Sequence, residues 1–295
     1  MGKSLLLQAE YSDIAVEIGF WAWKALLDEV YTTPKPGLVD FYSCGAHHDM
    51  NMRTFQESAK AIQPYFVHMA EQGYTLNCSP SELFAQIRKT GIEAEKAMYR
   101  ATNDVNTHKG LIFTIGIFCA AAGRCLREDN QMLTLDKLIE LEKKMVSDVL
   151  AREIQCISTE NAFSHGEVNI KNYGTSGIRG EAMNGYPSLV HFAIPTLLDG
   201  IRKNKVWNRA KLQTLFVLMS QVEDSNIISR HNPKILSQVQ KEAQCFLNQG
   251  GAYQRDAIEK LYKMDLEYKK RNISAGGCAD LLAAGIFLVL LLERW

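Results

Sequence analysis

Apolar residues recur at helical spacing along most of the chain, and no convincing run of alternating strand residues bounded by turns interrupts them. The sequence therefore predicts an all-α fold. With 295 residues and 46% hydrophobic content, the chain can bury a substantial core and lies near the upper size limit of one domain. We expect a single compact domain over residues 1–295, with an active site built from inter-helix loops. About ten helices are expected, near residues 12–29, 52–72, 80–101, 108–123, 134–156, 187–202, 208–230, 233–248, 252–270 and 278–293.

Local signals mark some helix ends. Ser79 can cap a helix that begins at Pro80, and Glu82 completes a capping box. Pro64 and Pro195 predict kinks or breaks, because each proline removes a backbone donor.

Three stretches lack the helical pattern, at residues 32–50, 158–186 and 272–277. The second is rich in Gly, Asn and Ser and is longer than an ordinary connection in a compact domain. We expect it to be a lid or binding loop that closes over bound substrate. A disordered insertion is the alternative, but Tyr173 and Arg179 are unusual residues for a purely solvating linker.

The bulk composition excludes several classes of protein. Lys plus Arg equal Asp plus Glu at 33 each, so nothing indicates a nucleic-acid surface. The seven cysteines form no CxxC pair, which disfavours a zinc site and is typical of a reduced, cytoplasmic protein. The apolar run at residues 279–292 is too short to cross a membrane and predicts a buried core helix. The first residues carry too short an apolar run for a secretory signal.

Small residues mark one face of the expected helix at residues 108–123. Gly116, Ala120 and Gly123 follow each other at spacings of four and three. This face lets another helix approach closely.

The start of the same helix predicts a phosphate site. His108 and Lys109 fall in its first turn, where the helix dipole disfavours cations unless an anion is bound. Backbone N–H groups at a helix N-terminus also bind phosphate. The alternative is an ordinary cap from Asn106 or Thr107 with a solvated Lys109.

The expected helix at residues 208–230 carries an apolar stripe that runs into polar residues. Its members are Leu212, Phe216, Met219, Glu223, Asn226 and Arg230. Continuing a core-facing stripe with charged groups is unfavourable unless they meet ligands, ions or partners. We therefore expect the polar end of the stripe to face a site, with an internal salt bridge between Glu223 and Arg230 as the alternative.

The loop at residues 32–50 concentrates Lys35, two histidines, Asp40 and Asp49 among prolines and glycines. Such clustering suits a site, although Pro-Lys-Pro-Gly is also an ordinary turn. Without a Cys cluster, oxygen ligands favour Mg²⁺, which takes one or two carboxylates plus substrate phosphates. The candidate ligands are Glu29, Asp40, Asp49, Glu223, Asp224 and Asp280. The chain has no GxxxxGK[ST] loop and no strand-flanked GxGxxG, so helices and loops must hold any nucleotide.

Ordered motifs over most of the chain, from about Glu29 to Leu282, resemble the triphosphoribosyl-dephospho-coenzyme A synthases that serve citrate lyase and malonate decarboxylase. The motifs are TPKPGLVD at 33–40, GAHHDM at 45–50, NTHKG at 106–110, HGE at 165–167, GIRGE at 177–181, EDSN at 223–226 and SAGGCADLL at 274–282. One departure is the sequence Arg230, His231, Asn232, where the family pattern has Arg and glycines. The arginine is kept, but the backbone freedom of glycine is lost.

The resemblance implies an all-helical transferase that joins the triphosphoribosyl group of ATP to the 2′-hydroxyl of 3′-dephospho-CoA and releases adenine. The implied catalytic residues are Asp40, Asp49, Glu181 and His108. The implied substrate-binding residues are Lys35, His47, Asn106, Thr107, Lys109, His165, Glu167, Arg179, Asn226, Arg230, Gly276 and Gly277. We expect Mg²⁺ as the cofactor and the candidate ligands given above. The product would pass to a transferase that modifies an acyl carrier protein; no nucleic-acid or membrane partner is expected, and a homodimer is one option.

In the implied chemistry, the groups that bind the phosphates differ from those that act at C1′ of the ATP ribose. Loss of adenine develops positive charge at C1′, which a carboxylate would stabilise while another carboxylate or His accepts the proton of the attacking hydroxyl. An α-linked product from β-linked ATP implies one inverting displacement. Two alternatives belong to other classes: a helical nucleotide N-glycosidase or phosphotransferase, and a non-enzymatic module that binds an acyl carrier protein.

Overall fold

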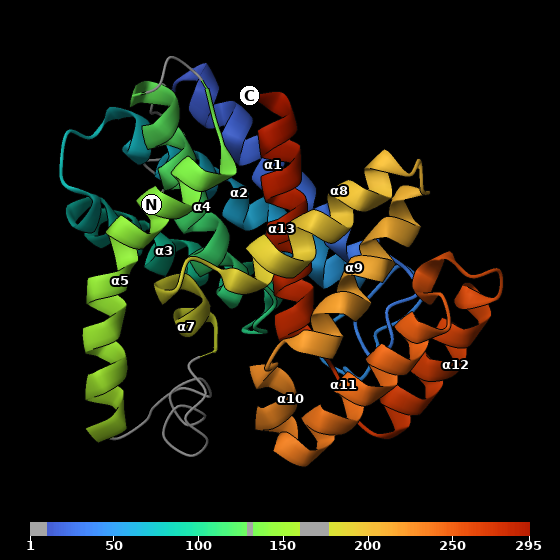
Figure 1. The fold of residues 1–295 in the computed structure, drawn as a ribbon. Coiled ribbons are helices and arrows are strands. Elements are labelled where there is room, and N and C mark those ends of the chain that lie inside the picture. Colours follow the sequence, from blue (N-terminus) through green and yellow to red (C-terminus); the bar gives the residue numbers. More distant parts are fainter. Residues whose placement is uncertain (1–10, 129–131, 160–176) are drawn as a thin grey trace.

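A computed structural model describes residues 11–128, 132–159 and 177–295 (Figure 1). Within these residues every regular element is a helix, which confirms the predicted all-α fold. The α-helices are α1 (Asp13–Val30), α2 (Met52–Thr75), α3 (Pro80–Thr102), α4 (Lys109–Glu128), α5 (Leu135–Thr159), α7 (Gly177–Met183), α8 (Ile194–Arg202), α9 (Trp207–Gln221), α10 (Ser225–Arg230), α11 (Pro233–Asn248), α12 (Ala257–Lys270) and α13 (Gly276–Arg294). A π-helical segment, η2 (Leu189–Ala193), and a 3₁₀ turn, η3 (Gly251–Tyr253), complete the set.

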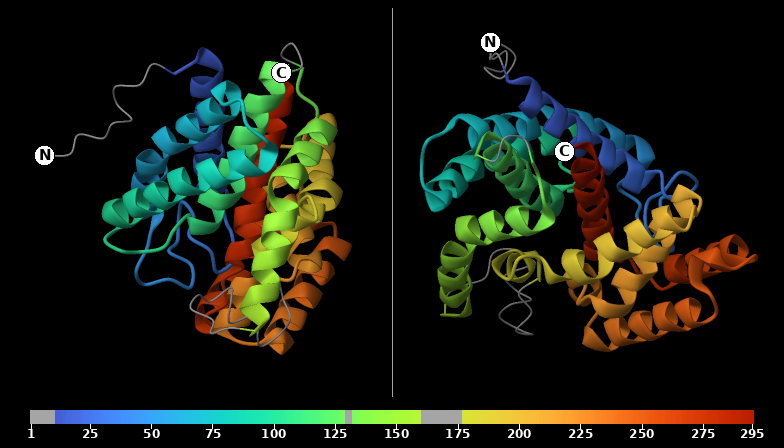
Figure 2. Two further views of the ribbon diagram at one scale, coloured as in Figure 1. Left: turned by 90° about the vertical axis from the view of Figure 1, so that its left-hand side faces the viewer. Right: turned by 45° about the horizontal axis from the view of Figure 1, so that its top comes forward.

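Helix α13 passes through the middle of the molecule, as the two views in Figure 2 show. It contacts α1, α4, α8, α9 and η2. Most of its side chains between Cys278 and Leu291 are buried, so the predicted core helix is confirmed. Helices α4 and α13 are long and apolar enough to cross a membrane, but 83% and 67% of their apolar windows are buried inside the protein. Both have the character of core helices.

Helices α2 and α4 approach closely through small residues. A Cβ atom on Gly73 would overlap the carbonyl oxygen of Ala120, and one on Gly123 would overlap that of Ala70. A Cβ atom on Gly116 would likewise overlap the sulfur of Met69. The predicted small-residue face of α4 is therefore confirmed, and a larger side chain at these positions would force the helices apart.

The structure confirms the predicted capping box at Ser79 but shows no break at one of the two prolines. The capping box at Ser79 is present, since its hydroxyl accepts from the N–H of Glu82 and the Glu82 carboxylate accepts from the N–H of Ser79. Pro195 lies in the first turn of α8, directly after the π-helical segment, as a break requires. Pro64 lies inside α2, which continues from Met52 to Thr75, so the break is absent there.

The expected single helix at residues 208–230 is wrong. Helix α9 ends at Gln221, and α10 begins at Ser225. The Asp224 carboxylate accepts hydrogen bonds from the N–H groups of Asn226 (2.9 Å) and Ile227 (3.2 Å) and so caps a new helix. The periodic stripe gave no sign of this break, because Glu223, Asn226 and Arg230 also fit one continuous helix face.

The long loop expected at residues 158–186 is partly helical. Helix α5 continues to Thr159, and α7 occupies Gly177–Met183. The predicted site residues His165 and Glu167 lie outside the described residues. Closure of this segment over substrate stays a prediction.

Two buried lysines hold the C-terminal end of α1. Lys35 donates to the main-chain oxygen of Glu29 (2.9 Å), and Lys211 donates to that of Asp28 (2.8 Å). Cations suit this end of a helix, where carbonyl groups lack partners and the dipole is negative. Burial, opposed by the charge of Asp28, lowers the pKa of Lys211 to about 8. This arrangement fixes the last turn of α1, which carries the Glu29 side chain.

Glu142 on α5 is a fully buried carboxyl. Its exposed fraction is 0%, and neither of its side-chain oxygens has a hydrogen-bond partner among the described residues. Burial raises its pKa from 4.5 to about 9, against the opposing charge of Lys143. The group is therefore protonated in the folded protein at neutral pH.

We predict that Glu142 makes the protein less stable as pH rises from about 4.5 to about 9. In this range the unfolded chain releases the proton and the folded protein keeps it, so unfolding becomes progressively more favourable. Glu142→Met, which has similar volume and no charge, should raise the free energy of unfolding at pH 8 by about 2 kcal/mol and flatten its pH dependence. Urea denaturation at several pH values measures both effects. Glu140→Met, at an exposed position on the same helix, is the control and should leave the pH slope unchanged.

Candidate active site

A cleft of about 800 Å³ opens where segments far apart in the sequence meet. It lies among the loop between α1 and α2, the N-terminal ends of α4 and α13, α7, and the junction of α9 with α10 (Figure 1). The sequence-predicted residues that line it are Glu29, Lys35, His47, Asp49, Asn106, Thr107, Lys109, Glu181, Glu223, Asp224, Asn226, Arg230, Gly276, Gly277 and Asp280. The matched motifs within the described residues thus converge on one place.

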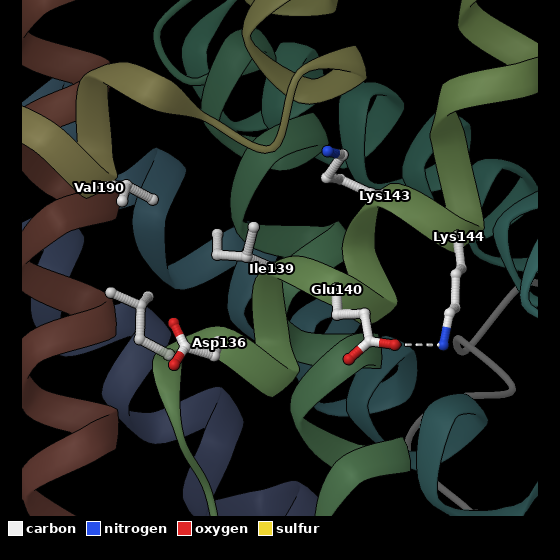
Figure 3. Close-up of a pocket in the computed structure, with 7 residues that line it drawn as sticks. Asp136, Ile139, Glu140, Lys143, Lys144 and Val190 are labelled. Carbon is white, nitrogen blue, oxygen red and sulfur yellow. Dashed lines mark hydrogen bonds and ion pairs between the residues drawn. The ribbon is translucent and has the colours of Figure 1, made fainter.

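A second hollow, of about 430 Å³, lies between α5 and η2 (Figure 3). Its lining includes Lys143, Val190 and the ion pair between Lys144 and Glu140 (2.6 Å). None of the predicted site residues lines it. The larger cleft is therefore the candidate site.

Carboxylates gather on one side of the cleft. Burial and the charges of Glu29 and Asp224 raise the pKa of Asp280 well above its ordinary value. Its carboxylate lies against the N-terminal end of α4, since a Cβ atom on Gly110 would overlap it. Lys35 forms an ion pair with Glu29 and is the buried cation of this group. The side is acidic, and a further cation would stabilise it.

Asp224 joins two helices at the base of the cleft. Besides capping α10, its carboxylate accepts a hydrogen bond of 2.8 Å from the N–H of Cys278 in the first turn of α13. Burial raises its pKa, and the hydrogen bonds from Cys278, Ile227 and Asn226 oppose that rise. One buried carboxylate therefore serves the positive ends of two helices.

Arg230 and His47 form a basic side. Arg230 Nη2 lies 3.1 Å from His47 Nδ1, and His47 Nε2 lies 3.0 Å from the Ser274 hydroxyl oxygen. Asp49 Oδ1 is 3.9 Å from His47 Nδ1, and the Asp49 side chain is 62% exposed. Burial, followed by the charge of Arg230, lowers the pKa of His47 to about 4. His47 is therefore uncharged at neutral pH.

Asp40 and His108, predicted as catalytic, do not line the cleft. Asp40 accepts hydrogen bonds from the N–H groups of Lys35 (2.8 Å), Tyr42 (2.8 Å) and Ser43 (3.0 Å), which fixes the loop. His108 Nδ1 lies 2.6 Å from the Ser58 hydroxyl, and burial together with the Lys35 charge lowers its pKa to about 3. Both lie behind the lining and support it. A chemical role for Asp40 or His108 has no contact with the cleft to support it.

The N-terminal end of α4, where the sequence predicts a phosphate site, lines the cleft. Asn106 caps it by accepting from the N–H of Lys109 (3.2 Å), and Thr107 donates to the hydroxyl of Ser58 (2.7 Å). The Lys109 side chain forms an ion pair of 3.0 Å with Glu95 and is half exposed. Both earlier interpretations therefore have support, because the cap exists and the helix end still faces the cleft.

Helix α7 contributes Glu181, whose carboxylate accepts from the N–H (3.1 Å) and the hydroxyl (2.6 Å) of Ser188. Arg179 on the same helix does not line the cleft. The sequence prediction missed Ser274, which lies in a matched motif just before the glycine pair of α13. The position of Ser274 just before the start of a helix could have identified it as a candidate site residue.

The carboxylates of the cleft decide whether the expected Mg²⁺ site has ligands. Within residues 11–128, 132–159 and 177–295, no group of three or more His, Cys, Asp or Glu side chains is arranged to hold a metal ion. Asp40 and Asp224 already accept backbone hydrogen bonds. Glu29, Asp49, Glu223 and Asp280 line the cleft. Of these, Glu29, which is paired with Lys35, lies close enough to Asp280 to raise its pKa, so these two are the neighbouring oxygen donors.

Comparison with known proteins agrees with the motif resemblance. Residues 15–295 match the family model described as ATP:dephospho-CoA triphosphoribosyl transferase. The chain is 38% identical over 267 residues to the 2-(5''-triphosphoribosyl)-3'-dephosphocoenzyme-A synthase of Escherichia fergusonii, which covers 90% of this chain and 88% of that protein. It is 37% identical over 285 residues to a probable synthase of the same name from Streptococcus mutans, with 93% and 96% covered. No solved structure matches the chain significantly.

Removal of the Asp224 carboxylate should destabilise the protein. Asp224→Ala leaves buried N–H groups of α10 and α13 without an acceptor, so we expect a loss of about 3 kcal/mol in the free energy of unfolding. Asp224→Asn keeps one acceptor oxygen and should lose less. Urea denaturation measures the change, with Asp199→Ala on the surface as the control. Equal stability of Asp224→Ala and the unaltered protein would contradict the double-cap role.

Proposed function

The chain belongs to the ATP:dephospho-CoA triphosphoribosyl transferase family, and we propose that its cleft joins the triphosphoribosyl group of ATP to the 2′-hydroxyl of 3′-dephospho-CoA with release of adenine. The observation that carries this proposal is the convergence of the family motifs on one cleft. Its acidic and basic sides suit a reaction in which phosphates are held while a ribose carbon reacts.

Cations on different segments can hold the phosphates of the two substrates. Lys109 lies on α4, at a helix end that also offers backbone N–H groups, and Arg230 lies on α10. Both line the cleft. The phosphates stay intact because the proposed reaction takes place at C1′ of the ribose, where the bond to adenine breaks.

Two of the carboxylates predicted as catalytic line the cleft, and we assign them complementary roles. Glu181 accepts the proton of the attacking 2′-hydroxyl, with its carboxylate held by Ser188. Asp49 stabilises the positive charge that develops at C1′ as adenine departs with the electron pair of the glycosidic bond and takes up a proton from water. Attack of the 2′-hydroxyl on the face of the ribose opposite adenine produces inversion and hence an α-linked product.

Magnesium fits the acidic side of the cleft. The phosphate site proposed at the N-terminal end of α4 adjoins the Asp280 carboxyl group. Burial and the charges of Glu29 and Asp224 raise the pKa of this group, and a bound cation would favour its ionised form beside the phosphate. Glu29 and Asp280 would hold the ion, which would neutralise phosphate charge. The chain's own residues then carry the proton transfer.

We place this reaction in the cytoplasm and assign its product to the acyl carrier protein of citrate lyase, with malonate decarboxylase as the alternative. Exposed thiols at Cys44 and Cys245 suit a reducing compartment. The product would reach its carrier through a second transferase. Neighbouring genes that encode citrate lyase subunits would support the assignment.

We expect incubation with ATP, Mg²⁺ and 3′-dephospho-CoA to release adenine and give a product that retains all three ATP phosphates. Mass spectrometry of the product and chromatography of adenine measure this. Release of adenine without dephospho-CoA would indicate a nucleotide N-glycosidase, and ADP formation in step with turnover would indicate a phosphotransferase. Coenzyme A should react more slowly, because its 3′-phosphate crowds the attacking hydroxyl.

Variants refine the same experiment. Glu181→Gln should lower kcat by about 10² to 10⁴ and change KM little, as expected for loss of a general base. Glu140→Gln is the matched surface control and should be unaffected. Full activity of Glu181→Gln would show that another group is the general base.

Binding of ATP should depend on Mg²⁺. Calorimetry in Mg²⁺ and in EDTA should show at least about tenfold weaker ATP binding in EDTA, since phosphate would then meet the acidic side directly. Asp280→Asn removes one proposed ligand and should reduce the difference between the two conditions, whereas Asp199→Asn should not. Equal ATP affinity in both conditions would refute the metal proposal.

A further inference from the structure

Arg230, His47 and Ser274 form a hydrogen-bonded row along the cleft lining. They come from α10, the loop after α1 and the segment before α13. Arg230 also donates to the main-chain oxygen of Ala46 and to the side chain of Asn272, both at 3.3 Å, so its guanidinium is held in place. The Ser274 residue is 2% exposed and lines the cleft.

The arginine determines which ring nitrogen of His47 carries the proton. A guanidinium group only donates hydrogen bonds, so the nitrogen that faces it needs a free lone pair. Arg230 Nη2 lies nearer to Nδ1 (3.1 Å) than to Nε2 (3.4 Å). The proton of the uncharged ring therefore lies on Nε2, which donates to the Ser274 hydroxyl oxygen at 3.0 Å.

This direction is opposite to that of a nucleophilic serine. The set of Ser274, His47 and Asp49 looks like a Ser-His-Asp triad, in which the ring would accept the serine proton. Here the ring donates, so the serine oxygen accepts a hydrogen bond and keeps its own proton. Among the described residues, the hydroxyl has no other partner, and its proton is available to a ligand in the cleft.

We propose that Ser274 donates a hydrogen bond to a phosphate oxygen of bound substrate, with Arg230 and His47 setting the direction of that bond. The inference rests on the proposed function, which supplies substrates with phosphate chains. The surroundings favour an anion, because Arg230 is cationic and Gly276 begins α13 without a side chain to cover its backbone. The side-chain nitrogen of Asn226 lies close to Gly276, since an added Cβ would be 3.0 Å from it and would have to push the Asn226 side chain aside.

The negative groups nearby limit where the phosphate can lie. Asp49 is largely exposed, and Asp224 is engaged by backbone N–H groups. A phosphate oxygen at Ser274 would therefore meet donors first. The phosphate chain belongs either to ATP or to the pyrophosphate of dephospho-CoA, and binding measurements with each substrate separate the two.

The ring proton can be located directly. Nitrogen-15 NMR of histidine-labelled protein at pH 7 should show His47 with its proton on Nε2 and an unprotonated Nδ1. Arg230→Gln, whose amide can accept as well as donate, should give a mixture of the two forms. A proton on Nδ1 in the unaltered protein, or labelling of Ser274 by diisopropyl fluorophosphate, would overturn the inference in favour of a nucleophilic serine.

Binding measurements test the ligand. Ser274→Ala should weaken binding of either ATP or 3′-dephospho-CoA by about tenfold in calorimetry, as expected for one hydrogen bond to a charged group. The other substrate should change by less than about twofold, and the affected one identifies the phosphate chain. Ser81→Ala, at an exposed position, is the control, and an unchanged denaturation midpoint shows that the variant is folded. Unaltered affinity for both substrates in an enzyme that still forms product would refute the role of Ser274 and leave the proposed function standing.

Discussion

The double cap at Asp224 is the interaction on which the cleft depends. One buried carboxylate accepts backbone hydrogen bonds from Asn226, Ile227 and Cys278 and so ties α10 to α13. Because α10 carries Arg230 and α13 carries Asp280, this contact sets the distance between the basic and the acidic sides of the cleft. Desolvation of the carboxylate opposes the arrangement, and the two helix dipoles offset that cost.

Each side of the cleft has a charged group that other residues hold in place. Lys35 pairs with Glu29 and at the same time holds the end of α1. Arg230 is fixed by carbonyl groups from two loops. Charged side chains that are already held lose little further freedom when a ligand arrives, which favours tight and specific binding.

Helical periodicity predicted most of the fold, because apolar faces at helical spacing leave few other arrangements. The helix at Pro233–Asn248 was placed to the residue, and the capping box at Ser79 fixed another start. The break after Gln221 escaped prediction, because it depends on an acceptor for the distant N–H of Cys278. Local sequence contains no information on that contact. The same limit applies to the site: the motifs indicated segments that meet at one cleft, but only the tertiary structure shows that Asp40 and His108 are hydrogen-bonded outside its lining.

The position of α13 has a consequence for how this molecule can move. The helix forms the centre of the hydrophobic core and also supplies the floor of the cleft at Gly276, Gly277 and Asp280. The floor therefore cannot shift or loosen without disturbing the core, so opening of this region costs nearly as much free energy as global unfolding. On the opposite side, α7 packs mainly on α5, so a motion there that admits substrates would leave α13 undisturbed. The floor of the cleft is thus part of the central core helix, whereas its α7 side is joined to the rest of the molecule mainly through α5.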